Sequence, residues 1–278
     1  MSLLQIGLVD TTGKIDVALV QAAAAALNVQ VTRDLPQFWP IQATVRYLPH
    51  ATQVPVGVWP VQLVTKLPPG EGGFHMNKHN QPYSKVIASP TSDEWTIDAS
   101  HETIEMLVDP YGNKLQSSQS IEIASGNIQD GTGEFEYLVE ACDPCEADKY
   151  AYPIQGIAVS DFITPRFYDP VVTPGTRYSF TGAIKAPRQI LPGGYISFVN
   201  AEADEVQQIL WVDPNSPPQL VNLGAADGVS LRQWVDGRMQ AVAKKKRHAN
   251  IELMEHCKKH RQSLEQFARA RGKFYSVN

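Results

Sequence analysis

The sequence predicts a mixed α+β fold, and three observations predict it. Residues 16–28 and about 99–108 have the composition and apolar spacing of helices. Residues 39–48 alternate apolar and polar side chains, which is typical of a half-buried strand. Good helix formers dominate after residue 228, so a long helix is expected at the end. A chain of 278 residues with 43% hydrophobic and 19% charged residues can bury a core without disulfides.

The first predicted elements follow a helix–strand–strand order. In chain order they are a helix at 16–28, strands at 39–48 and 56–67, an edge segment at 74–88 and a helix at about 99–108. The first helix can be capped by Asp16, because a carboxylate accepts hydrogen bonds from the free N–H groups of a first turn. The helix near residue 100 ends where Pro110 and Gly112 stop it.

An irregular, β-rich segment follows. Short strands are expected at 121–123, 135–141, 154–159, 178–184 and 195–199. Gly193 and Gly194 mark a turn or a close approach of two backbones. The chain then changes character, and we divide it into a globular domain, 1–227, and a basic helical segment, 228–278. On the long helix, one apolar stripe is formed by Ile251, Met254, Cys257, Leu264 and Phe267.

Charge is unevenly distributed along the chain. Residues 228–278 contain 12 of the 24 Lys and Arg residues but 4 of the 29 Asp and Glu residues, so they carry +8 and the rest −13. The basic segment therefore either packs on the acidic body or meets a protein partner. The basic run 244–247 is interpreted as a solvated surface, since no aromatic residue or nucleic-acid-binding motif accompanies it. We expect no nucleic-acid partner.

No signal peptide is evident at the N-terminus, and the alanine run 22–26 is too short to span a bilayer. The expected location is the cytoplasm without membrane attachment, with non-classical export as an alternative. Three cysteines do not make a disulfide framework. Cys142 and Cys145 form a lone C-x-x-C, which fits a local disulfide, a free dithiol or half of a metal site.

The candidate chemical site is one arc of the helix near residue 100. His101, Glu105 and Asp109 follow each other at intervals of four, with Glu102 beside them, and the opposite face is apolar. Three carboxylates within two turns repel one another unless a cation lies among them, and the arc holds no Lys or Arg. Two further histidine pairs are interpreted as loop and surface residues, namely His75 with His79 and His256 with His260.

The sequence His101-Glu102-x-x-Glu105 resembles the H-E-x-x-H signature of the zincin metallopeptidases. The order of elements from about 15 to 145 also resembles that family. The resemblance implies a Zn²⁺ ion held by His101 and Glu105, with Glu102 as the general base. It also implies a peptide or protein substrate that pairs with the edge segment. For the third ligand we favour Asp109, with two rivals, Asp143 and Asp161.

The departure from the signature is Glu105, which stands where the family has histidine. A carboxylate makes the site less positive, so bound water would be acidified less, and harder metals such as Mn²⁺ or Ca²⁺ would also fit. The alternative function is therefore a non-catalytic interaction or assembly protein that retains the fold. An active enzyme would also need an oxyanion stabiliser, for which Tyr111, Tyr168 and His79 are candidates.

Overall fold

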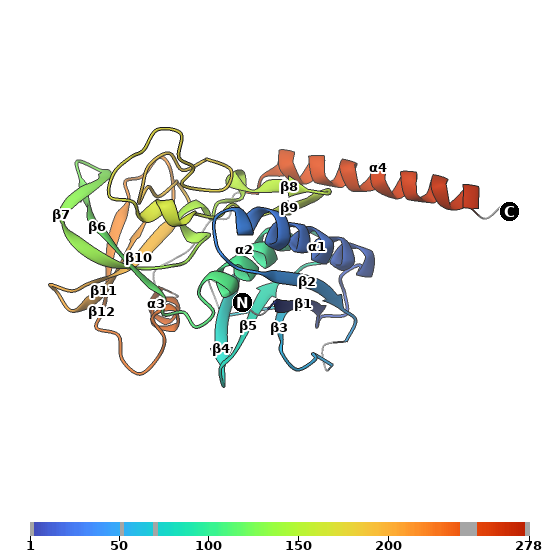
Figure 1. Ribbon diagram of the computed structural model, residues 1–278, viewed down its shortest axis with the longest axis horizontal. Coiled ribbons are helices and arrows are strands. Elements are labelled where there is room, and N and C mark those ends of the chain that lie inside the picture. Colours follow the sequence, from blue (N-terminus) through green and yellow to red (C-terminus); the bar gives the residue numbers. More distant parts are fainter. Residues whose placement is uncertain (1–2, 51–52, 69–71, 240–248, 276–278) are drawn as a thin grey trace.

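The computed structural model describes residues 3–50, 53–68, 72–239 and 249–275. These residues fold into two five-stranded sheets, a small hairpin and four α-helices, of which the last projects from the body (Figure 1). The predicted α+β class with a mixed sheet and a C-terminal helix is confirmed.

The first sheet is mixed and has the strand order β2-β1-β3-β5-β4. Its strands are β1 (Leu4–Asp10), β2 (Ala43–Leu48), β3 (Val58–Val64), β4 (Gly73–Lys78) and β5 (Gln81–Ile87). Four of them are parallel, and β4 is the antiparallel edge strand. The interior strand β1 was absent from the sequence prediction, although its apolar side chains form part of the main core.

Two helices cover one face of this sheet: α1 (Val17–Val29) and α2 (Trp95–Val108). Asp16 caps α1 as predicted, since its carboxylate accepts a hydrogen bond from the N–H of Ala18. Ile6 and Leu8 of β1 are fully buried in the core that both helices share. Val9 points to the other face, where it packs in a separate small cluster. The alternation along β1 thus sets which side of the sheet carries the helices.

Strand register places His75 on the helix side of the sheet. Val61 of β3 pairs with Ser84 of β5, and Ser84 pairs with His75 of β4. Residues in register share a face, and Val61 lies in the core beneath the helices. The interpretation of His75 as a loop histidine was therefore wrong. The polar segment around it is an edge strand, and His75 is fully buried.

The second sheet is antiparallel, in the order β12-β11-β10-β7-β6. Its strands are β6 (Leu115–Ala124), β7 (Asn127–Leu138), β10 (Tyr195–Asn200), β11 (Glu205–Leu210) and β12 (Gln219–Gly224), and a separate hairpin consists of β8 (Tyr152–Ile154) and β9 (Ile157–Val159). The strand expected at 178–184 was wrong, because this segment forms turns and a single bridge between Ile163 and Ser179.

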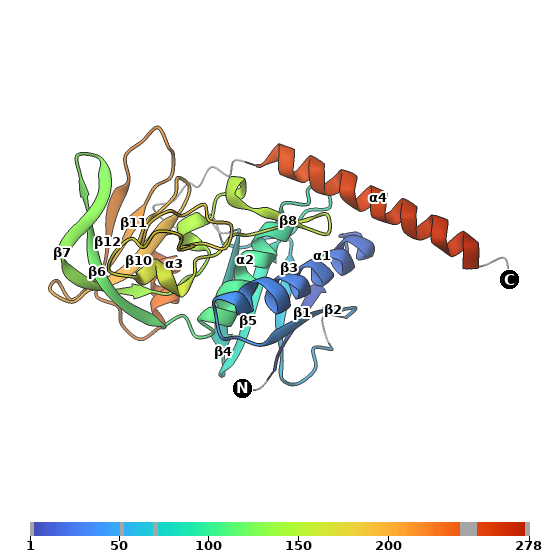
Figure 2. The ribbon, with the colours of Figure 1, turned by 45° about the horizontal axis from the view of Figure 1, so that its top comes forward.

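The predicted long basic helix is divided into α3 (Leu231–Met239) and α4 (Ile251–Tyr275). The run 244–247 lies outside the described residues. The first turns of α4 are anchored on the body, where Cys257 is fully buried and Arg261 donates to the carbonyl of Gly156 at 2.8 Å. Beyond this anchor α4 extends away from both sheets (Figures 1 and 2).

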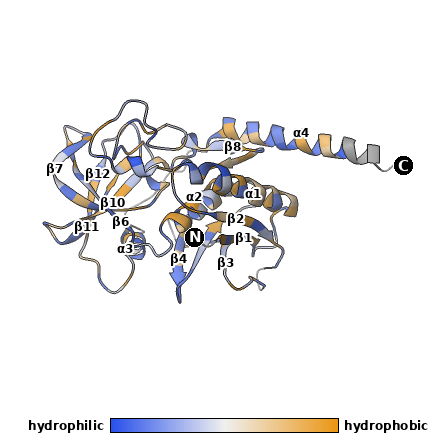
Figure 3. Cartoon of the chain, viewed as in Figure 1, coloured by the Kyte–Doolittle hydropathy of each residue, from blue (hydrophilic) through white to orange (hydrophobic). Residues whose placement is uncertain are grey.

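The apolar stripe predicted on α4 is buried at Cys257 but exposed at Ile251, Leu264 and Phe267, which are 71%, 44% and 62% exposed. Much of the helix is hydrophilic (Figure 3). In the described part of the chain, none of the helices is both long and apolar enough to cross a membrane.

Candidate metal centre

Helix α2 places three ionisable side chains in the interior of the protein. His101 is 6% exposed, Glu102 3% and Glu105 0%. The sequence predicted one polar arc opposite an apolar face, yet the whole helix is buried on both sides. The first sheet covers one side and the segment that follows β7 approaches the other. Burying several ionised groups is costly unless each is paired, so their partners decide what the site does.

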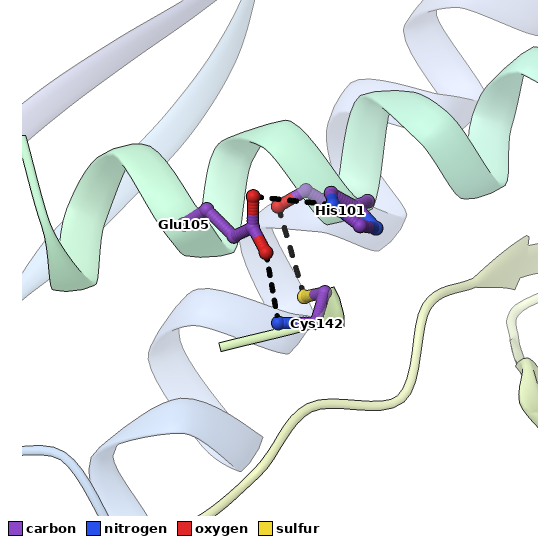
Figure 4. A group of neighbouring side chains, drawn as sticks. All are labelled: His101, Glu105 and Cys142. Atoms are coloured by element: carbon purple, nitrogen blue, oxygen red, sulfur yellow. Dashed lines mark hydrogen bonds and ion pairs between the residues drawn. The ribbon is translucent and has the colours of Figure 1, made fainter. Parts of the chain in front are cut away.

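His101 lies at the centre of one group of ligand atoms. Its Nε2 is 3.1 Å from Oε2 of Glu105 and 3.2 Å from Oδ1 of Asp143. Oε1 of Glu105 accepts a hydrogen bond from the backbone N–H of Cys142 at 3.0 Å, and the thiol of Cys142 donates to the carbonyl of His101 (Figure 4). His101, Glu105 and Cys142 each offer a ligand atom within 4.8 Å of the others.

His75 lies at the centre of a second group, which also includes Glu105. Its Nδ1 is 3.5 Å from Oε2 of Glu102 and 3.7 Å from Oε2 of Glu105. Its Nε2 is 3.7 Å from Oε2 of Glu140, which follows β7. His75, Glu105 and Glu140 form the other group whose ligand atoms all lie within 4.8 Å. The edge strand and the end of β7 thus supply partners that the helix alone does not hold.

Arg232 is a cation that enters this cluster from a distant part of the sequence. Its Nη1 is 3.1 Å from Asp143 Oδ2, 3.4 Å from Glu105 Oε2 and 3.5 Å from Glu140 Oε2. The start of α3 is fixed beside the end of α2, since the N–H of Arg232 donates to the carbonyl of Gly112 at 3.0 Å. Gly112 has a φ of +64°, a conformation that favours glycine, and a Cβ there would lie 2.7 Å from Arg232.

Two close backbone approaches hold the carboxylates in position. A Cβ on Gly194 would lie 2.6 Å from the carbonyl oxygens of Asp143 and Pro144, so the second sheet presses directly on the turn that carries Asp143. The close approach predicted at Gly194 is thereby confirmed. A Cβ on Gly73 of β4 would lie 2.8 Å from Oε1 of Glu102. Glycine at both positions leaves room for the acidic side chains to pack.

The electrostatics separate the carboxylates into two kinds. Burial tends to raise the pKa of Glu105, but the charges of His101 and Arg232 outweigh it and hold that pKa well below its ordinary value. Burial raises the pKa of Glu140 well above its ordinary value, and Arg232 offsets this incompletely. Burial also raises the pKa of Glu102, which the neighbouring His75 opposes. Glu105 is therefore the firmly ionised member of the cluster.

The pKa of His101 is shifted upward, whereas that of Glu105 is shifted downward. Burial alone would lower the pKa of its imidazole, but the charge of Glu105 and the hydrogen bond with Asp143 raise it well above its ordinary value. In the absence of another cation, the protein thus favours the protonated ring, which cannot bind a metal. Metal binding at His101 would release that proton.

The remaining predicted residues lie apart from the two groups. Asp109 ends α2, and its Oδ2 accepts a hydrogen bond from the N–H of Lys114 at 2.8 Å. Asp161 accepts hydrogen bonds from Phe162 and Thr181. Asp143, the other rival for the third ligand, is the one that contacts His101.

The sulfur atoms and the possible oxyanion stabilisers are placed as follows. Cys142, Cys145 and Cys257 are buried free thiols, and burial raises the pKa of each.

Tyr111 is 45% exposed, whereas Tyr168 is buried. Burial and the charge of Glu140 raise the pKa of Tyr168. Of the two tyrosines, Tyr168 is thus the one near the cluster.

Several buried polar atoms of the cluster lack a hydrogen-bond partner among the described residues. They are both ring nitrogens of His75, both carboxylate oxygens of Glu140, Oε2 of Glu102 and Oδ1 of Asp143. Unsatisfied buried groups cost about 1–3 kcal/mol each, and more when charged. Arg232 contacts three of the cluster's four carboxylates, so acidic groups outnumber the arginine. Both features fit a site that can hold a metal ion.

Sequence reasoning missed His75, Glu140 and Arg232 as members of the cluster. His75 required the register of three strands, and Arg232 is 127 positions from Glu105. One signal pointed toward Glu140, which stands two residues before Cys142 in a segment already under attention. An isolated glutamate at a strand end carries no pattern of its own.

Comparison of the chain with protein-family models, with curated proteins and with solved structures gave no match. Function is therefore inferred from the cluster itself.

Proposed function

We propose that this protein is a zinc-dependent, peptidase-like protein whose metal is held by His101, Glu105 and Asp143. The distances among their ligand atoms support this assignment. Ligands about 2.0–2.1 Å from a tetrahedral zinc ion lie about 3.3–3.4 Å from one another. His101 Nε2 lies 3.1 Å from Glu105 Oε2 and 3.2 Å from Asp143 Oδ1, which are close to the separations expected between two ligands of one ion. The thiol of Cys142 is near enough to compete as a ligand.

Glu102 is the proposed general base. It follows His101 directly, its Oε2 is without a hydrogen-bond partner among the described residues, and burial raises its pKa toward neutrality. The zinc ion, when bound, would polarise a peptide carbonyl and make a water molecule more acidic. Glu102 would then accept the proton of that water and pass it to the leaving amine. Glu105 lowers the positive charge of the site compared with histidine, so a slow enzyme is expected.

The burial of the cluster favours a second function, a non-catalytic protein that retains the fold. His101 is 6% exposed and Arg232, at 5%, lies against three of the carboxylates. A substrate would require α3 to move away from the end of α2. In the non-catalytic protein the ion would instead join α2 to the Asp143 turn. The exposed end of α4, with Leu264 on its surface, would then serve as the contact for a protein partner.

Metal analysis and a proteolysis assay on matched variants test the proposal. The wild-type protein, reloaded with zinc after chelation, is expected to cleave a mixed peptide library. Glu102→Gln should keep its zinc and lose the cleavage, because it retains the shape but not the base. His101→Ala should lose both. Zinc retained in His101→Ala would contradict the proposed centre, and zinc-loaded wild type without cleavage would favour the non-catalytic function.

A further inference from the structure

The histidine on the edge strand marks a position that the proposed zinc centre does not use. His75, Glu105 and Glu140 bring one imidazole and two carboxylates together from β4, α2 and the segment after β7. All three are buried, at 0%, 0% and 4% exposure. Their ligand atoms lie within 4.8 Å of one another. From these observations we infer that this group binds a second divalent cation, with Glu105 as a ligand shared by both ions.

The unsatisfied atoms support a cation at this position. Neither nitrogen of His75 and neither carboxylate oxygen of Glu140 has a hydrogen-bond partner among the described residues. Ser84, which pairs with His75 in the strand register, also has a buried hydroxyl without one. In the group around His101, by contrast, both partners of the imidazole lie within 3.2 Å. The missing interactions thus concentrate around His75 and Glu140.

One ion cannot serve both histidines in this arrangement. In the described part of the chain, the two groups of potential ligands share Glu105, and neither contains both His75 and His101. A carboxylate can bridge two ions about 3.5–4 Å apart. Charge supports this arrangement as well. When the imidazoles are neutral and Glu102, Glu105, Glu140 and Asp143 are all ionised, these four carboxylates and Arg232 leave three negative charges, which one divalent ion does not neutralise.

The donor set defines the kind of ion. One imidazole nitrogen with two carboxylates suits Zn²⁺ or Mn²⁺, whereas Ca²⁺ and Mg²⁺ take oxygen ligands alone. Arg232 lies 3.5 Å from Glu140 and 3.4 Å from Glu105, so its guanidinium must shift when the second ion enters. Glu102 is 3.5 Å from His75 and would lie beside this ion.

This inference rests on the proposed function in one respect, that Glu105 is a metal ligand. The test is the number of zinc or manganese ions bound by the full chain after chelation, reloading and removal of excess metal, measured by elemental mass spectrometry. Two ions per wild-type chain are expected. Glu140→Gln and His75→Asn should each bind one, and His101→Ala should also bind one. His79→Asn, in the turn after β4, is the matched control and should bind two.

The outcomes separate the two ideas. One ion in wild type that is lost in His101→Ala and kept in Glu140→Gln overturns the second site and leaves the proposed centre standing. One ion that is kept in His101→Ala and lost in Glu140→Gln supports the His75 group and overturns the proposed centre. No bound ion in wild type overturns both. The wild-type count does not depend on whether any variant folds.

Discussion

The two histidines of the cluster both approach Oε2 of Glu105 but have different surroundings. His101 contacts Glu105 and Asp143 at 3.1 and 3.2 Å. His75 is also buried, and among the described residues its nearest carboxylate oxygen lies at 3.5 Å. The His101 group contains close ion pairs, whereas the His75 group leaves more buried polar atoms for a ligand to satisfy.

Removing the residue shared by both groups should have the largest effect. Glu105→Ala eliminates a ligand of both groups and leaves Arg232 and His101 without their common partner. Breaking a buried ion pair typically costs about 3–5 kcal/mol, so the free energy of unfolding should fall by about that amount. Urea unfolding and metal analysis measure the two losses. A variant that binds as many ions as wild type would show that Glu105 does not connect the two groups.

Arg232 acts on both groups as a built-in cation, so its removal should alter stability and metal affinity in opposite directions. In the chelated protein, Arg232→Met should lower the free energy of unfolding by about 3 kcal/mol, because three carboxylates of the cluster, and Asp236 on α3, lose their counter-charge. Zinc should bind more tightly to this variant, since the competing guanidinium is gone. The exposed Arg46, changed to Met, is the control. Weaker zinc binding in Arg232→Met would mean that the arginine assists the metal instead of competing with it.

The His101 group should also give the chelated protein a characteristic pH dependence. The pKa of His101 is raised in the folded state, so its stabilising effect is fully present below the unfolded pKa of about 6.5. That effect is lost as the pH rises through the folded pKa, with a slope of at most about 1.4 kcal/mol per pH unit. Urea unfolding from pH 6 to 9 should show this decline.

His101→Gln should show a smaller decline over the same range. Glu140, whose pKa is raised by burial, contributes a decline of the same sign in both proteins, so the comparison isolates the histidine. Parallel profiles for wild type and variant would contradict an ion-paired His101.

The last comparison is between single substitutions of two aspartates, Asp143 and Asp109, each of which removes local contacts only. Asp143→Asn should weaken zinc binding by more than the roughly 10–100-fold typical of residues that merely orient a ligand. Asp109→Asn should leave zinc affinity unchanged and cost about 0.5–1.5 kcal/mol, because its carboxylate bonds to the N–H of Lys114. Isothermal titration and thermal unfolding separate these effects. Equal losses of affinity in both variants would assign Asp109 a direct role.

The part of the site that could be predicted from sequence is the part carried by one helix. His101, Glu102 and Glu105 are neighbours on α2 because of helical spacing alone. The helix 16–28 and its cap at Asp16 follow from equally local signals. His75 depends on pairing between three strands, and a shift of one residue would turn it to the opposite face. Arg232 depends on where a distant helix docks, which no local pattern contains.

The same reasoning explains the errors in the fold. The interior strand β1 has a glycine in its middle, and its burial on both faces removes the polar–apolar alternation that marks a half-buried strand. The segment 178–184 has strand-like composition, but turns bring it against Phe162 and Ile163. In both segments, tertiary contacts determined the structure and outweighed the local sequence pattern.

Anomalous diffraction from zinc-soaked crystals tests the two-group cluster most directly. Data collected at the zinc absorption edge should show two peaks about 3.5–4 Å apart, one bonded to His101 and the other to His75, with Glu105 between them. A single peak at His101 would confine the metal to the proposed centre. A cluster without a peak, in which Arg232 still contacts its three carboxylates, would contradict the account and leave a buried ion-pair network as the role of these residues.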